Sequence, residues 1–167
     1  ISAIAMVGVT AGTIALVVQE VGKTTREMGQ MEPGMAILDV AGPLGHPTHL
    51  QENGSVICIG GGLGIAPLFP ITKQLKAMGN HVTTILGARS SNLLFWEDLM
   101  LSVSDELIVT TDDGSKGLKG VVTNPLREIL ASGKPVDAVY CIGPVIMMKF
   151  VVKVTKEFNT PTIVSLN

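Results

Sequence analysis

The sequence predicts an α/β protein in which a doubly wound, five-stranded parallel sheet follows part of an antiparallel β-barrel. Three observations support this class. Apolar runs separated by glycine and proline turns fill the first 52 residues. From residue 53 onward, short apolar runs alternate with segments of helical apolar spacing. At the first strand-to-helix transition the sequence reads GGGLGIAP, a loop with few side chains. We therefore expect two domains, residues 1–52 and 53–167.

The partial barrel begins with strand-like runs at residues 1–7, 13–20 and 35–40. Residues 1–18 carry no charge and have the length that can span a bilayer. Gly8 and a Thr-Ala-Gly turn interrupt this run, however, and no basic flank or aromatic belt accompanies it. A β-hairpin is the better prediction, and we expect no membrane partner.

One short helix is expected in the first domain. Thr24 and Glu27 have the spacing of a capping box, and Gly29 would end the helix. The backbone amides of residues 24–26 would then stand at a helix start, which attracts anions.

The second domain repeats a strand-then-helix pattern. The predicted strands are residues 55–59, 81–86, 107–111, 138–142 and 162–166. The predicted helices are residues 66–78, 92–103, 124–131 and 145–158. Ligands of such sheets bind at the carboxyl ends of the strands. The loops GGGLGIAP, GARSS, TTDDGSKG and CIGPV are therefore expected to carry the chemistry.

The glycine loop points to a dinucleotide. Residues 62–67 read GxGxxP, which keeps two glycines of the dinucleotide fingerprint and replaces the third with proline. We expect a pyrophosphate at the helix start, where Pro67 and Pro70 would lie in the first turn, and where a side chain at Gly64 would meet the phosphates. No Gly-Lys-Ser/Thr follows, so the loop is not a P-loop. The alternative is a tight bend without a ligand.

The next two loops leave alternatives open. Arg89 follows the second predicted strand, where it would suit a 2′-phosphate, stack on adenine or remain a solvated loop charge. Asp112 and Asp113 favour a solvated turn or a ribose contact over a metal site or acid–base pair, because no third ligand lies nearby.

The net charge, the cysteines and the histidines argue against several functions. A formal net charge of −2 argues against a nucleic-acid partner. Cys58 and Cys141 lie inside apolar runs, which favours the reducing cytoplasm over a secreted disulfide framework. The histidines do not pair with Cys141 in any catalytic pattern, and His46 and His49 lack further metal ligands. We expect no metal site within this chain.

Taken together, the motifs resemble those of the ferredoxin–NADP reductase superfamily. The matching elements are GxxT at residues 22–25, GPLG at 42–45, then GGGLGIAP, GAR, TTDDGS, CIGPVIMMK and the terminal VSLN. Within the superfamily, the chain is most similar to small electron-transfer subunits, those of NADH-dependent ferredoxin:NADP oxidoreductase (sulfide dehydrogenase) and of dihydroorotate dehydrogenase.

The resemblance implies a flavoprotein oxidoreductase subunit that passes hydride from NAD(P)H to FAD and then electrons to iron–sulfur carriers. It implies an FAD site at Val18, Gln19, Gly22, Thr24 and Thr25. It implies an NAD(P) site at Gly61, Gly62, Leu63, Gly64, Ile65, Ala66, Pro67, Gly87, Ala88, Arg89, Asp112, Asp113, Gly114, Cys141, Gly143, Pro144 and Met147. Cys141 would pack against the nicotinamide and would not be a nucleophile.

The resemblance also implies partners. A larger catalytic or flavoprotein subunit would complete a hetero-oligomer, and ferredoxin is a candidate electron carrier. A 2Fe-2S cluster is expected only in a C-terminal segment beyond this chain. A dihydroorotate dehydrogenase subunit would differ in its partner rather than in its chemistry. An alternative of another class is a non-catalytic NAD(P)-sensing module without flavin.

Overall fold

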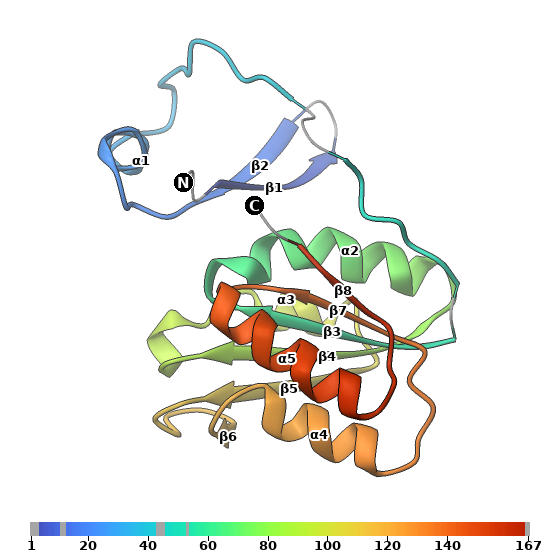
Figure 1. Cartoon of the computed structure of the whole chain (residues 1–167). Coiled ribbons are helices and arrows are strands. Elements are labelled where there is room, and N and C mark those ends of the chain that lie inside the picture. The colour runs from blue at the N-terminus through green and yellow to red at the C-terminus, as the bar shows by residue number, and fades with distance from the viewer. Residues whose placement is uncertain (1–3, 11–12, 43–45, 53, 166–167) are drawn as a thin grey trace. The chain divides into compact units, whose positions relative to one another are not determined.

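The computed structural model describes residues 4–10, 13–42, 46–52 and 54–165 (Figure 1). Contacts within the chain separate two compact units, Ile1–His49 and Leu50–Asn167. The division falls three residues before the boundary expected between residues 52 and 53. Assignment of the units to flavin and nucleotide remains a prediction at this stage.

The first unit contains the predicted hairpin. Strand β1 (Ile4–Thr10) pairs antiparallel with β2 (Thr13–Val18), and a register shift interrupts the pairing between Met6 and Gly8. Helix α1 (Lys23–Gly29) follows and ends at the predicted glycine. Among the described residues, no helix combines the length and apolar character needed to cross a membrane.

Two predictions for this unit are wrong. Residues 35–40 form no strand, because a strand needs a neighbour for its backbone groups and the described part of the chain offers this segment none. The helix also begins earlier than the Thr24–Glu27 capping box requires. Gly22 is its N-cap, and the Thr25 hydroxyl accepts hydrogen bonds from the N–H groups of Val21 and Gly22, both at 3.0 Å. Thr25 thus performs the role expected of Glu27.

The second unit is a parallel sheet. Its strands are β3 (Ser55–Gly61), β4 (His81–Ala88), β5 (Glu106–Thr111), β6 (Leu118–Lys119), β7 (Ala138–Ile142) and β8 (Thr162–Val164). The spatial order is β6-β5-β4-β3-β7-β8, and every pairing is parallel. The five predicted strands are therefore confirmed. The sixth, β6, has only two residues, both exposed, and lacks the apolar run by which a strand is found in a sequence.

Helices cover both faces of this sheet (Figure 1). The longer ones are α2 (Ile65–Ala77), α4 (Thr123–Ala131) and α5 (Val145–Glu157); α3 (Glu97–Leu101) and the 3₁₀ turns Gly62–Gly64 and Ser91–Leu93 are short. Helices α4 and α5 pack on one face and share a buried core with β3, β4 and β7. Alternation along β3 sends Ile57 and Ile59 into that core, whereas Cys58 faces Thr72 of α2 on the opposite side.

The helix predicted at residues 92–103 is divided. A 3₁₀ turn at Ser91–Leu93 and the short α3 are separated by Trp96, whose backbone is left-handed at φ 58°. Its indole packs edge-on against Phe95 and against Phe69 of α2, with ring centroids 5.5 and 6.0 Å apart. Aromatic packing between elements therefore overrides the helical spacing of this segment.

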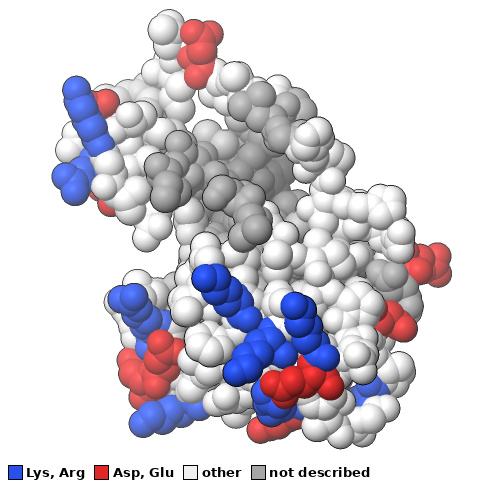
Figure 2. Space-filling model, viewed as in Figure 1, with Lys and Arg blue, Asp and Glu red and all other residues white. Residues whose placement is uncertain are grey.

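Surface charges of both signs meet over α4 and α5 (Figure 2). The Arg127 guanidinium of α4 pairs with the Glu157 carboxylate of α5, and this pair links the middle of α4 to the C-terminal end of α5. Because both side chains are about half exposed, the pair adds little to stability.

Candidate functional site

The sheet has a topological switch point at β3. From this strand the chain first winds to β4 on one side and later returns to β7 on the other. Gly60 of β3 lies opposite Ile142 of β7, so the glycine loop and the CIGPV loop leave neighbouring strands at the same edge. Crevices at such points are where dinucleotides bind in doubly wound folds.

The glycines of this crevice have different roles. Gly62 adopts φ +54°, and a Cβ built on it would meet no atom within 4 Å, so a ligand can approach its backbone. Gly64 faces protein instead. A Cβ there would overlap the Ile142 carbonyl oxygen and lie 2.7 Å from the carbonyl carbon and 2.8 Å from Gly143 Cα. The expectation that a side chain at residue 64 would meet a pyrophosphate is therefore wrong.

The start of α2 lies beside Gly62, but its first amides are not all free: the Ile65 N–H donates to the Gly62 and Leu63 carbonyls, and Pro67 has no N–H. Gly64 is the N-cap of this 13-residue helix, and no side chain caps its first amides. The positive end of the α2 dipole favours an anion beside Gly62. Pro67 lies in the first turn as predicted, but Pro70 lies beyond it, inside the helix, where it cannot donate to the Ala66 carbonyl.

Met147 packs against glycines of both loops, Gly61 and Gly143. A Cβ on Gly61 would meet the Met147 thioether, with the methyl carbon at 3.0 Å, and would contact Pro144 Cδ at 3.4 Å. A Cβ on Gly143 would meet the same methyl group and lie 3.0 Å from the Gly61 carbonyl oxygen. The structure thus brings together four predicted residues, and both glycines are needed for this close packing.

Cys141 lies inside the core shared by β7 and α5, with no exposed surface. Burial raises the pKa of its thiol from 9.0 to about 12, so the group is a neutral thiol near pH 7. Burial likewise raises the pKa of Cys58 to about 12, partly offset by a hydrogen bond with Thr72. Contact between Cys141 and a nicotinamide remains a prediction, and it requires the side chain to become exposed.

The loops after β4 and β5 are joined through their backbones. The Asp112 N–H donates to the Ala88 carbonyl at 3.1 Å, and the Asp113 N–H donates to the Arg89 carbonyl at 3.2 Å. Arg89 is itself exposed. The Asp113 carboxylate accepts hydrogen bonds within its own turn, including one from the Ser115 N–H at 2.9 Å, and these bonds lower its pKa.

The remaining predicted nucleotide contacts surround these positions. Leu63, Ile65 and Ala66 continue the glycine loop into α2, where Ile65 and Ala66 are fully buried, so only their backbone groups can reach a ligand. Gly87 is the penultimate residue of β4, and a Cβ there would overlap Val122. Gly114 has φ +77° and turns the chain beside Lys119. Among the described residues, no three His, Cys, Asp or Glu side chains cluster as a metal site.

Sequence reasoning missed a pair of side chains at this edge. The Lys116 ammonium lies 2.9 Å from the Glu97 carboxylate at the start of α3. The two residues are 19 positions apart, and Glu97 directly follows Trp96, the left-handed N-cap of α3. No pattern in the sequence predicts such a pair.

The predicted flavin residues lie together in the first unit, between β2 and α1. Val18 ends β2, and Gln19, Gly22 and Thr24 are exposed around the turn. Thr25 is buried, and its hydroxyl is occupied by the N–H groups that it caps. Contact of these residues with FAD remains a prediction.

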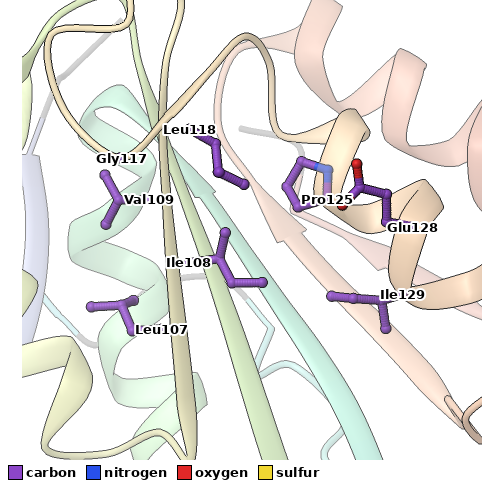
Figure 3. Close-up of a pocket in the computed structure, with 8 residues that line it drawn as sticks. All are labelled: Leu107, Ile108, Val109, Gly117, Leu118, Pro125, Glu128 and Ile129. Atoms are coloured by element: carbon purple, nitrogen blue, oxygen red, sulfur yellow. The ribbon is translucent and has the colours of Figure 1, made fainter. Parts of the chain in front are cut away.

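A separate groove of about 360 Å³ lies between β5, β6 and α4 (Figure 3). Ile108, Leu118 and Ile129 give it apolar walls, and Glu128 is the acidic residue that lines it. None of its lining residues belongs to the glycine loop, and Glu128 has no residue of opposite charge beside it in the lining. The groove therefore has no evident part in the chemistry of the crevice.

Comparison with known proteins identifies the family. Residues 58–153 match the family model described as the oxidoreductase NAD-binding domain. The chain belongs to this family. The matched range includes every predicted NAD(P) residue, all of β7 and the last four residues of β3. For a domain of this family, the fold predicts a nucleotide site at the switch point.

The relatives extend this assignment. The chain is 47% identical, over 93% of its length and 55% of the relative's, to a Thermotoga maritima protein named dihydroorotate dehydrogenase B (NAD(+)), electron transfer subunit homolog. It is 39% identical, over 89% of its length and 56% of the relative's, to a probable subunit of the same name from Methanocaldococcus jannaschii. A solved NADH-dependent reduced ferredoxin-NADP oxidoreductase is 46% identical with a TM-score of 0.81, covering 92% of this chain and 55% of that one.

The resemblance to the ferredoxin–NADP reductase superfamily is thereby confirmed. The chain spans about half the length of the relatives that it matches. More distant structures, such as a flavohemoglobin from Malassezia yamatoensis at 18% identity and a TM-score of 0.72, share the fold.

Proposed function

We propose that this chain is the nucleotide-binding part of a flavoprotein electron-transfer subunit that passes hydride from NAD(P)H to FAD. The observation that carries the proposal is the switch point at β3, where Gly62 has a positive φ, a Cβ on it would meet no atom within 4 Å, and α2 begins directly after the glycine loop. The family match and the relatives, whose names describe electron-transfer subunits and an NADH-dependent oxidoreductase, support it.

The residues of the chain would act by binding and alignment. Gly62 and the positive end of the α2 dipole would hold the pyrophosphate, and Gly143, Pro144 and Met147 would position the nicotinamide. When bound, NAD(P)H supplies the hydride and FAD accepts it, so no acid–base group of the protein is required. The neutral, buried Cys141 agrees with this proposal, because its high pKa makes it a poor nucleophile.

The flavin would be held by the first unit, around Val18, Gln19, Gly22, Thr24 and Thr25. Gly22 fits this role, because a Cβ there would meet no atom within 4 Å and a ligand can approach the backbone. The pyrophosphate of the flavin would lie against exposed backbone at this turn rather than at a Thr24–Glu27 capping box.

The whole protein would work with a larger subunit and with iron–sulfur carriers such as ferredoxin, any 2Fe-2S cluster lying beyond this chain. We propose a reducing, cytoplasmic setting, since both cysteines are free and buried. The second candidate is the electron-transfer subunit of dihydroorotate dehydrogenase, which the names of the Thermotoga and Methanocaldococcus relatives favour. Co-purification of the partner subunit distinguishes the two.

Anaerobic titration of the purified protein with NADH tests the proposal. We expect visible flavin absorption that bleaches as NADH is added. Gly62→Ala should weaken NADH binding, because its methyl group projects into the open crevice. Gly133→Ala is the matched control, since Gly133 also has a positive φ and open surroundings but lies outside the predicted site. NADH binding without any flavin would instead indicate the sensing module, and no NADH binding would refute the proposal.

A further inference from the structure

The Glu97–Lys116 ion pair lies beside the loop that follows β4. Lys116 is 52% exposed and Glu97 22% exposed, and their charged atoms are 2.9 Å apart. Ser115, the neighbour of Lys116, accepts a hydrogen bond from the Ser91 N–H through its hydroxyl at 2.8 Å. The loop after β5 is therefore attached at two places, Arg89 and Ser91, to the loop after β4.

This position matters for coenzyme choice. In doubly wound folds the end of the strand next to the glycine-loop strand reads the 2′ position of the adenosine ribose. That strand is β4, which pairs with β3 along its length. Lys116 is the cation that the β5 loop brings to this edge, and a cation here would favour a 2′-phosphate. In the structure, Glu97 already holds that cation.

The backbone fixes Glu97 in place. Trp96, immediately before it, has a left-handed backbone at φ 58°, which is costly for a bulky residue and persists only when its surroundings enforce it. Edge-on contacts of the Trp96 ring with Phe69 and Phe95 hold the backbone in this conformation. Trp96, Glu97 and Lys116 line a hollow of about 420 Å³ together with Asp98 and Leu99.

We propose that Glu97 is a specificity-determining residue that favours NADH over NADPH by neutralising Lys116. The inference rests on the proposed NAD(P) site. With Glu97 present, a 2′-phosphate would have to displace the carboxylate from Lys116 and would be repelled by it. A 2′-hydroxyl carries no charge, so NADH meets neither penalty. Because the pair is partly exposed, its effect is modest, about two- to fivefold in affinity.

The test compares NADH and NADPH dissociation constants for the purified protein and its variants, measured by coenzyme fluorescence at low salt. Glu97→Gln should tighten NADPH binding about two- to fivefold relative to NADH. Lys116→Met in the Glu97→Gln background should cancel the gain. The change should also shrink at 0.5 M salt, because exposed charges are screened over about 4 to 5 Å there.

Asp98→Asn is the matched control. Asp98 is the next residue, lines the same hollow and loses the same charge, but its carboxylate is not part of the Lys116 pair. It should leave the NADPH-to-NADH ratio unchanged. An equal effect of Asp98→Asn, no effect of Glu97→Gln, or a wild-type preference for NADPH would each overturn the inference. If the wild-type protein binds neither coenzyme, the proposed function itself fails.

Discussion

Gly64→Ala would test whether the glycine loop is built for packing as well as for a ligand. The new methyl group would overlap the Ile142 carbonyl oxygen and lie 2.7 Å from its carbon, whereas ordinary contact begins at 3.4 Å. The start of α2 and the loop after β7 must therefore separate by at least about 0.7 Å to clear the carbon, and by more to clear the oxygen. Both sides are backbone, so no side-chain rotation can relieve the overlap.

The expected cost follows from this geometry. Overpacking of this kind typically costs about 1 to 3 kcal/mol. Alanine recovers about 0.4 to 1 kcal/mol by restricting the unfolded chain, because Gly64 has a right-handed conformation that alanine adopts readily. The net loss is about 1 to 2 kcal/mol, which lowers Tm by about 2 to 8 °C for a domain of this size. NADH affinity should also fall, because the crevice lies between the two separated segments.

Thermal unfolding followed by circular dichroism, together with NADH titration, provides the assay. Gly133→Ala serves again as the control, because it has φ +78° and open surroundings. Gly133→Ala should lower Tm only through the strain that a positive φ imposes on alanine, and it should leave NADH affinity unchanged. An unchanged or higher Tm for Gly64→Ala, with NADH affinity intact, would refute the packing role assigned to Gly64.

Arg89→Ala should lose NADPH affinity selectively if Arg89 pairs with a 2′-phosphate, and should weaken both coenzymes equally if it holds adenine or the loop; coenzyme titrations decide. Cys58 and Cys141 should resist iodoacetamide at pH 8 until the protein unfolds, as mass spectrometry would show, and Cys141→Ser should still permit flavin reduction by NADH. Because burial raises the pKa of both thiols from 9.0 to about 12, the free energy of unfolding should fall as pH rises above about 9. Hydrogen bonds from Lys76 and the Val82 N–H lower the pKa of Asp105 from 3.8. The ionised Asp105 therefore stabilises the folded protein above pH 3.8, and this stabilisation is lost as the pH falls below that value. Asp105→Asn should remove this pH-dependent stabilisation from acid unfolding curves.

Local chemistry was sufficient to predict much of the fold. The five principal strands of the second unit are apolar runs of the expected length, and their ends fall within two residues of the predicted ones. The helix ends at Gly79, Gly133 and Asn159 are positions with positive φ, which glycine and asparagine tolerate best. The meeting of the predicted loops at one edge also followed, because parallel strands place their carboxyl ends at the same edge.

Packing between distant segments explains the failures. Residues 92–103 have helical spacing, yet contacts between Trp96 and the aromatic rings of Phe69 and Phe95 divide the helix. Residues 35–40 have strand character, yet a strand also requires a partner, and apolar spacing does not reveal whether one is present. At α1 the capping hydroxyl is that of Thr25, one of two adjacent threonines that the sequence does not distinguish.

The sequence by itself determined the alternation of strands and helices, the glycine loop at a strand end and the edge at which a dinucleotide would bind, because these depend on periodicity and backbone freedom within a few residues. Only the tertiary structure decided that Gly62 is open while Gly64 is packed against Ile142, and that Glu97 holds Lys116. Each of these depends on segments 19 or more positions apart in the sequence, and the distances between such segments are set by the packing of the whole sheet and its helices.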